Sequence, residues 1–501
     1  MQKVIFRFSD YSGSKNEENG KIIKNEQCVE IKEKYKFNKE DKEEDKYFKL
    51  LCKFAENVES KNNDKQNEED EYDIYISYGK KISLNIMDIN LDTGELRTKG
   101  YIGVLRKIVK LEEDYDVTVE IGSRFDKCDK QFFLRYILSS ISNYNKNYNK
   151  KYENFNPKSD ENDSIWDWLL IFAFTYQLEK AYTSGLFNKY KRFEYNDSKV
   201  KGVVDINRHI KYNIPFNGKI AYNKRELTHD NEIMHLILHA YDILNKRYPN
   251  EIFAFKDKNS KAYEAICAIK EVAPNYKSEN VQALIHKCSR KITHPYYHSY
   301  EHLRRICLLI IKNKGISFFD GNSSDIIGVM VNISKLWEEF LKNIVLSKIK
   351  NENTNVEYQY EIKLELKGKP EQFILKPDYV IQKEDKKYVL DAKYKIGWEK
   401  FISELNMEYI IDDYRQITNY VYLLDAQWGG VIFPYKDNSD FNGYYFNYNG
   451  GKHFYIFPLK VPKYDDGTNP DDWKKEFENN IREVIERIQN KMEIKKEDKN
   501  Q

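Results

Sequence analysis

The chain of 501 residues is long enough for roughly two to four domains, and its 82 lysine and arginine residues almost balance its 80 aspartate and glutamate residues. This balance excludes a generally basic nucleic-acid coat protein, so any surface that faces DNA must be a local patch. The sequence has no export signal, no apolar run of about 18 residues and no Cys-x-x-Cys pair, which indicates a cytoplasmic protein that does not span a membrane.

Two polar runs divide the first third of the chain. Residues 56–72 predict a solvated loop inside a β-rich N-terminal region, and the Asn/Lys/Tyr-rich tract at 142–163 predicts a connection to the next region. From there to about residue 320 most segments have helical periodicity, although "VKGVVDI" at 200–206 predicts a strand. We therefore expect a β-rich part followed by a mainly helical part.

The stretch at 323–344 predicts an amphipathic helix that begins at a Ser323 or Ser324 cap, because its apolar residues recur at three-to-four spacing. Glu338 lies at the edge of the apolar stripe of this helix. Apolar and polar residues then alternate strictly from 356 to 366, and this alternation predicts a single half-buried strand.

Four further elements follow near the C-terminus. Residues 408–424 have helical periodicity, and the apolar segments at 428–435 and 452–459 predict strands. A closing helix is expected from a cap at Asn469 and Pro470, with one apolar face along its length.

The most informative segment is "FILKPDYVIQKEDKKYVLDAKYK" at 373–395. It predicts two strands joined by a turn at 384–386, with Asp378 on the first strand and Asp391 and Lys393 on one face of the second. Two carboxylates about 4 Å apart repel by roughly 4 kcal/mol at a protein surface, so the arrangement favours a bound cation. Mg²⁺ or Mn²⁺ would suit oxygen ligands from Asp378, Asp391 and the Ala392 carbonyl, next to a lysine that can act on a phosphate.

Three other sequence patterns have less specific interpretations. Asp-x-Lys is also common in salt-bridged surface strands. His235 and His239 lie one helical turn apart, but Leu236 stands where a zinc protease needs glutamate, so a role at the edge of the core is favoured. The glycines near Lys21 lack the spacing and the Ser or Thr of a P-loop, so we expect no nucleotide bound by this chain itself.

The predicted order of helix, three strands, helix and strand, with Glu338, Asp378, Asp391 and Lys393 at those places, resembles the PD-(D/E)xK nuclease core of many restriction and repair enzymes. Gln416 and Tyr420 match the Gln-x-x-x-Tyr signature of its RecB-like members, one helical turn apart on one face. The resemblance implies that Glu338 completes the metal site, and that Gln416 and Tyr420 orient the site and the DNA backbone.

A closer resemblance covers roughly residues 100 to 460. "PDYVIQKEDKKYVLDAKYK", the "SRF" of residues 123–125, "VKGVVDINRHIKYN" and "NKRELTHDNEIMHLILHAYDIL" are similar to segments of McrC, the nuclease subunit of McrBC-type restriction systems, including the LlaJI-like branch. This implies a metal-dependent DNA endonuclease subunit of a GTP-dependent, modification-dependent restriction system. It also implies two partners, double-stranded DNA and a McrB-like AAA+ GTPase ring.

The expected fold is therefore α+β and α/β multidomain. Its parts are an N-terminal β-rich domain at 1–160 that contacts the motor, a mainly helical region at 161–320, a PD-(D/E)xK α/β core with a mixed sheet at 321–462, and a C-terminal helix and tail at 463–501. Two alternatives stay open: a non-catalytic adaptor that activates the AAA+ GTPase, and a stand-alone RecB-like repair exonuclease. Cleavage of DNA ends by the chain alone would favour the exonuclease.

Overall fold

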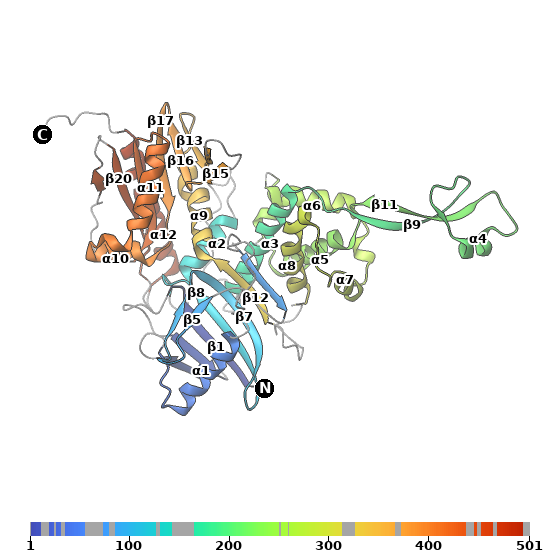
Figure 1. The fold of residues 1–501 in the computed structure, drawn as a ribbon, viewed down its shortest axis with the longest axis horizontal. Coiled ribbons are helices and arrows are strands. Elements are labelled where there is room, and N and C mark those ends of the chain that lie inside the picture. Colours follow the sequence, from blue (N-terminus) through green and yellow to red (C-terminus); the bar gives the residue numbers. More distant parts are fainter. Residues whose placement is uncertain are drawn as a thin grey trace. The chain divides into compact units, whose positions relative to one another are not determined.

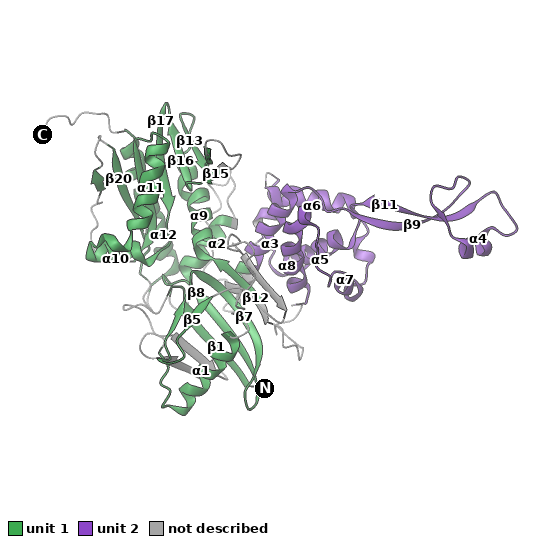
Figure 2. Ribbon diagram, viewed as in Figure 1, with its two compact units in different colours: residues 1–169, 322–501 green, residues 170–321 purple. Residues whose placement is uncertain are grey.

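The computed structural model describes residues 2–11, 20–24, 27–31, 36–55, 74–79, 86–126, 131–142, 165–249, 252–258, 260–312, 326–365, 372–436, 445–447, 452–463 and 468–493. The expected loop at 56–72 and nearly all of the tract at 142–163 lie outside these residues. The chain forms two compact units, one of residues 1–169 and 322–501 and the other of residues 170–321 (Figure 2).

A mixed sheet of seven strands forms the N-terminal part of the first unit (Figure 1). β1 runs parallel to β8, and the other neighbours in the sheet are antiparallel. Helix α1 (Lys42–Ala55) packs on the sheet through its buried face, which contains Phe48, Leu51 and Phe54. In spatial order the strands are β3 (Gln27–Ile31), β2 (Gly20–Lys24), β1 (Gln2–Ser9), β8 (Asp114–Gly122), β7 (Tyr101–Lys110), β12 (Ile326–Asn332) and β4 (Ile74–Gly79). A separate pair is formed by β5 (Met87–Ile89) and β6 (Leu96–Thr98).

The predicted helix at 323–344 is wrong in its first half. Residues Ile326–Asn332 form β12, which lies between β7 and β4 in the N-terminal sheet. The β-branched residues of this stretch suit a strand, and pairing on both sides outweighs the helical spacing of the apolar residues. The helix, α9 (Ile333–Phe340), begins instead at Asn332, whose side chain accepts a hydrogen bond from Ser334 N. A π-helical turn (Leu341–Val345) and a 3₁₀ turn (Leu346–Lys348) follow.

Two glycines allow β12 to approach β7 closely. Gly103 and Gly328 have φ values of 148° and 156°, and a Cβ atom on either residue would overlap the carbonyl oxygen of Val329 or Val104 on the opposite strand. Since most L-residues avoid this conformation, both positions require glycine.

Gly328→Ala is therefore expected to lower the free energy of unfolding of this unit by about 3 kcal/mol, through backbone strain and the overlap with Val104. Urea denaturation followed by tryptophan fluorescence would measure the loss. Gly122→Ala, in which the added Cβ would meet only the flexible side chain of Gln131, is the control in the same sheet and should stay within about 1 kcal/mol of the natural chain. Equal losses in the two variants would contradict this account of the contact.

The C-terminal part of the first unit is a second mixed sheet, of six strands, between helices. β17, β18 and β20 are parallel, whereas β13, β16 and β19 run antiparallel to their neighbours. α10 (Ile396–Glu404), a 3₁₀ turn (Met407–Tyr409) and α11 (Ile411–Leu423) cover one face, where Val389 and Ile417 share a buried cluster. α12 (Pro470–Glu493) covers the other face, where Tyr388 Oη donates to Met492 O. The strands are β13 (Thr354–Tyr358), β16 (Tyr379–Lys383), β17 (Lys386–Ala392), β18 (Trp428–Tyr435), β20 (His453–Lys460) and β19 (Tyr445–Asn447).

Several predictions for this part are confirmed and two are wrong. The strands at 428–435 and 452–459, the helix within 408–424 and the closing helix with its Asn469 start are present. The single strand at 356–366 is instead β13 and β14 (Ile362–Glu365), because the chain turns at Gln359 with a φ of 48°. The strand at 373–381 is likewise divided, by Pro377, into β15 (Gln372–Leu375), which pairs with β14, and β16.

The second unit is mainly helical, as predicted, and carries a long antiparallel ribbon of β9 (Lys189–Asp197) and β11 (Ile220–Thr228) that projects from its helices (Figure 1). At the far end of the ribbon are the short strand β10 (Val203–Val204) and α4 (Ile206–Asn213). The sequence predicts only a strand at 200–206 in this region. The helices of the second unit are α3 (Ile165–Thr183), α5 (Glu232–Arg247), α6 (Lys261–Val272), α7 (Val281–Lys287) and α8 (His298–Lys312), with 3₁₀ turns at Phe253–Phe255, Tyr276–Ser278 and Pro295–Tyr297. Helix α2 (Phe132–Ser142) belongs to the first unit.

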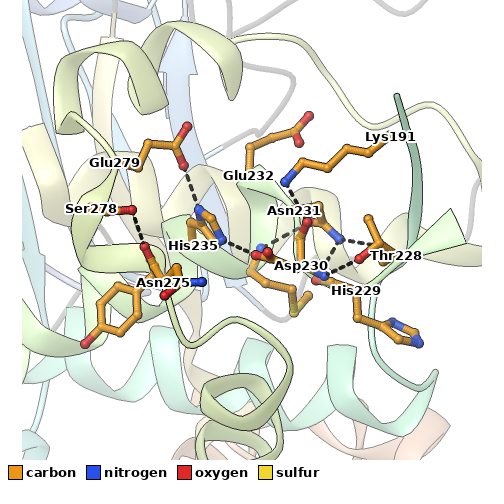
Figure 3. Close-up of polar contacts among 12 residues, drawn as sticks. Lys191, Thr228, His229, Asp230, Asn231, Glu232, His235, Asn275, Ser278 and Glu279 are labelled. Atoms are coloured by element: carbon orange, nitrogen blue, oxygen red, sulfur yellow. Dashed lines mark hydrogen bonds and ion pairs between the residues drawn. The ribbon is translucent and has the colours of Figure 1, made fainter. Parts of the chain in front are cut away.

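The base of the ribbon is fastened to α5 by polar contacts (Figure 3). Asn231 caps α5 by accepting hydrogen bonds from Ile233 N and Met234 N, and its amide donates to Phe187 O before β9. His235 lies between two carboxylates, with Nε2 2.5 Å from Asp230 Oδ1 and Nδ1 2.6 Å from Glu279 Oε2. His235 is 8% exposed, in agreement with the predicted place at the edge of the core.

Candidate active site

The two aspartates of the 373–395 segment lie side by side at the start of β16 and in β17. Asp378 Oδ2 accepts a hydrogen bond of 2.9 Å from Ala392 N, directly after Asp391, so the hairpin itself holds the two residues together. Asp391 is 2% exposed. Burial first, and then the charges of Asp391 and Glu338, raise the pKa of the Asp378 carboxyl well above its usual range. The charges of two other carboxylates therefore act on Asp378 at this place.

Glu338 reaches the same place from α9. Its backbone carbonyl accepts a hydrogen bond of 2.7 Å from Tyr379 Oη, which ties the helix to β16 directly beside Asp378. Both oxygens of its carboxylate lie 3.0 Å from Lys335 Nζ, and Tyr358 Oη donates to Oε2 at 3.4 Å. The misplaced start of the predicted helix thus does not remove Glu338 from the site.

Lys393 follows β17 and is held by a set of acceptors. Its Nζ lies 2.7 Å from Asp391 Oδ2 and 3.2 Å from Gln416 Oε1. Gln416 Nε2 in turn donates to Tyr420 Oη at 2.9 Å. Because the two residues are one turn apart on α11, Tyr420 contacts Gln416 and Gln416 contacts Lys393. Burial lowers the pKa of Lys393, but the charges of Asp391 and of Asp413 outweigh burial and raise it overall. The side chain is accordingly an ammonium near neutral pH.

A protein-family model described as the McrBC 5-methylcytosine restriction system component matches residues 96–434, a span that contains every site residue described above. The chain belongs to this family. The resemblance that the sequence motifs indicate is thereby confirmed.

Two solved structures from Thermococcus gammatolerans are similar to this McrBC family member at low identity. One is a half-complex from a tetradecameric assembly of McrB AAA+ hexamers with bound McrC, at 14% identity and a TM-score of 0.37, covering 88% of this chain and 93% of the other. The second is a McrBC complex, at 12% identity and a TM-score of 0.26, covering 60% and 79%. A search of curated proteins gives no match.

One residue of the site in this McrBC family member is not predicted from the sequence. Asp413, which is 6% exposed, lies 3.6 Å from Lys393 Nζ and 2.8 Å from Lys395 Nζ through Oδ1, and its Oδ2 accepts a hydrogen bond from Trp398 Nε1. Its place three residues before Gln416 puts it on the same helix face. That spacing could have indicated a site residue. An aspartate in the first turn of a helix is, however, common because it interacts favourably with the helix dipole.

The carboxylates of Asp378, Asp391 and Glu338 are suitable ligands for a hard divalent cation, although they do not surround a common point in this structure. Among the residues that the structure describes, no group of three or more His, Cys, Asp or Glu side chains is placed to hold a metal ion. Glu338 is paired with Lys335 and Asp391 with Lys393. Asp391 Oδ2 is buried with the Lys393 ammonium 2.7 Å away, and the three carboxylates are the oxygen ligands that Mg²⁺ prefers. A cation would relieve the repulsion that the Asp378 pKa reflects.

The surroundings of the site include two further lysines. Lys376, before Asp378, pairs with Glu361 at 3.1 Å, and Lys395 pairs with Asp413, while both lysine side chains stay about half exposed, at 48% and 56%.

None of the helices that the structure describes is long and apolar enough to cross a membrane.

Proposed function

We propose that this McrBC family member is the McrC-type subunit, a Mg²⁺-dependent DNA endonuclease of the PD-(D/E)xK type that cleaves phosphodiesters when an AAA+ GTPase partner drives it. The observation that carries the proposal is the convergence of Asp378, Asp391 and Glu338 beside the Lys393 ammonium, from two adjacent strands and a helix, within the span of the family match. A purely structural site would have no reason to gather three carboxylates that repel one another.

Each residue has a role in this proposal. Asp378, Asp391, Glu338 and the Ala392 carbonyl would hold Mg²⁺ or Mn²⁺. The bound ion supplies polarisation of the phosphate and a more acidic water. Lys393, released from Asp391, would face the scissile phosphate and neutralise charge that develops on its oxygens. Gln416 would keep the ammonium in place, and Tyr420 would orient Gln416.

DNA would be held through its phosphates. The exposed parts of Lys376 and Lys395 flank the site and can contact phosphate oxygens, which fixes the position of a duplex without reading its sequence. The near-neutral charge of the whole chain is consistent with a small contact area of this kind.

The partner is proposed to be a McrB-like AAA+ ring, as in the Thermococcus gammatolerans assembly of McrB AAA+ hexamers with bound McrC. The family resemblance implies motor contact by residues 1–160. A different surface has stronger physical support: the ribbon tip, residues 198–219, exposes a cluster of large apolar side chains. They are Val200, Val203, Val204, Ile206, Ile210, Tyr212, Ile214 and Phe216.

Polar contacts show that the ribbon tip is a folded module. Asp205 caps α4 by accepting a hydrogen bond from Arg208 N, and Arg208 donates to Asn223 of β11. The fully buried Asn213 pairs with Asn196 of β9. The apolar side chains are thus held out from an ordered surface, which suits a protein partner.

The test is to mix the chain with its AAA+ GTPase partner, GTP, Mg²⁺ and DNA that contains 5-methylcytosine. We expect cleavage only when all components are present, and its complete loss when EDTA removes the metal. Degradation of DNA ends by the chain without a GTPase would replace the proposal with the RecB-like exonuclease. Stimulation of the GTPase without cleavage in Mg²⁺ or Mn²⁺ would replace it with the non-catalytic adaptor.

A further inference from the structure

The loop that carries Lys393 is held by contacts with Ser123 and Arg124, which follow β8 of the N-terminal sheet. These contacts are called the clasp below. Lys393 and Lys395 both contact Asp413, whereas Tyr394 between them points the other way and is 1% exposed. The hydroxyl groups of Tyr394 and Ser123 lie 3.0 Å apart and share a hydrogen bond. Ser123 directly follows β8, so the contact joins residues 271 positions apart in the chain.

Arg124 secures the same loop at a second point. Its guanidinium lies 4.2 Å from the centre of the Tyr394 ring, within the range of a cation–π interaction. Its Nε and Nη2 atoms donate to Glu399 Oε1, in the first turn of α10, at 3.0 and 2.8 Å. One arginine thus holds both ends of the segment from Tyr394 to Glu399.

The arginine is itself fixed by the N-terminal sheet. Asp10, at the end of β1, accepts hydrogen bonds from Arg124 N and from Nη1, and both side chains are almost completely buried, with exposures of 0% and 3%. A buried arginine is tolerated only when its donors are satisfied, so its orientation is tightly determined. The sheet also supports the site at Glu338, because α9 starts directly after β12.

From these contacts we infer that Arg124 is a positioning residue for Lys393, and that the N-terminal sheet is therefore a working part of the active site. The inference rests on the proposed nuclease function. If the loop loses its clasp, Lys393 can still bind Asp413 and Gln416, but its ammonium shifts with the backbone. Misplacement of a reacting group by about 1 Å can cost about 100-fold in rate.

The test uses mild changes in the full chain, because loss of Arg124 would leave Asp10 buried without a partner. Glu399→Gln removes one charge from the clasp, and Tyr394→Phe removes the hydroxyl that bonds Ser123. Glu120→Gln is the matched control: this carboxylate pairs with Arg7 at 2.7 Å in the same sheet but does not contact the loop. Hydrogen–deuterium exchange of peptides that cover 393–399 would be compared with the single-turnover rate of cleavage at saturating DNA.

For the double variant Glu399→Gln/Tyr394→Phe we expect faster exchange confined to 393–399 and cleavage slowed by about 100-fold, with DNA affinity and GTPase stimulation unchanged. Glu120→Gln should change neither exchange nor rate. Unchanged exchange and cleavage in the double variant, or equal losses in the control, would overturn the inference. If the natural chain did not cleave DNA at all, the nuclease proposal would fail, while unchanged exchange in the double variant would still reject the clasp.

Discussion

Asp391→Asn is expected to slow DNA cleavage by at least about 1,000-fold while leaving the fold intact. Asparagine keeps the shape of the side chain but removes the negative charge, and electrostatic contributions of a metal site amount to several kcal/mol, each 1.36 kcal/mol being tenfold in rate. The loss of repulsion toward Asp378 should offset the loss of the ion pair with Lys393, which keeps Asp413 and Gln416 as partners. Cleavage of a labelled duplex in the presence of the partner and GTP would measure the effect.

The control for this change is Asp385→Asn, in the exposed turn of the same hairpin, which should cleave as the natural chain does. Lys393→Ala should resemble Asp391→Asn, because the ammonium would no longer be available to the phosphate. GTPase stimulation should persist in both site variants. Cleavage at the natural rate by Asp391→Asn would remove the assignment of the site.

The parts of the site that could be predicted are those that lie close together in the sequence. The hairpin of Asp378, Asp391 and Lys393 follows from strand alternation and a short turn. The resemblance to RecB-like nucleases indicates Gln416 and Tyr420, and the helical repeat places them on one face. Neither inference needs any knowledge of how distant elements pack. Their relative positions are accordingly as expected, although Pro377 ends the preceding strand earlier than alternation suggested.

The parts that could not be predicted depend on distant packing. Ile326, Met330, Ile333 and Trp337 have helical spacing, but the first two lie in β12, because β4 and β7 supply partners on both of its edges. The "SRF" at 123–125 could be seen only as a family motif, since its meaning lies in contacts with Tyr394 and Glu399. The positions of these partners depend on the packing of the two sheets.

The ribbon tip supports the second prediction of large effect. Ile206 and Phe216 are 67% and 68% exposed, and Phe216 lies near α4, with its ring centre 6.3 Å from that of His209. Truncating one of the few residues that dominate an interface costs about 2 kcal/mol or more, and a carboxylate placed there adds the cost of burying a charge. Ile206→Asp and Phe216→Asp should each weaken binding of the AAA+ partner by at least about 30-fold, and the double variant should lose GTPase stimulation and DNA cleavage together.

The folded state should not suffer from these changes, because neither side chain is packed in the core and surface substitutions usually change stability by less than about 0.5 kcal/mol. Leu91→Asp is the matched control: Leu91 is 64% exposed and lies within residues 1–160, the region that sequence analogy assigned to the motor. Partner affinity and stimulated GTP hydrolysis, measured for each variant, separate the two assignments. Loss with Leu91→Asp and none with Phe216→Asp would return the contact to the N-terminal region. The reverse result would place it on the ribbon tip, whose base is joined to α5 by the contacts of Asn231 and His235.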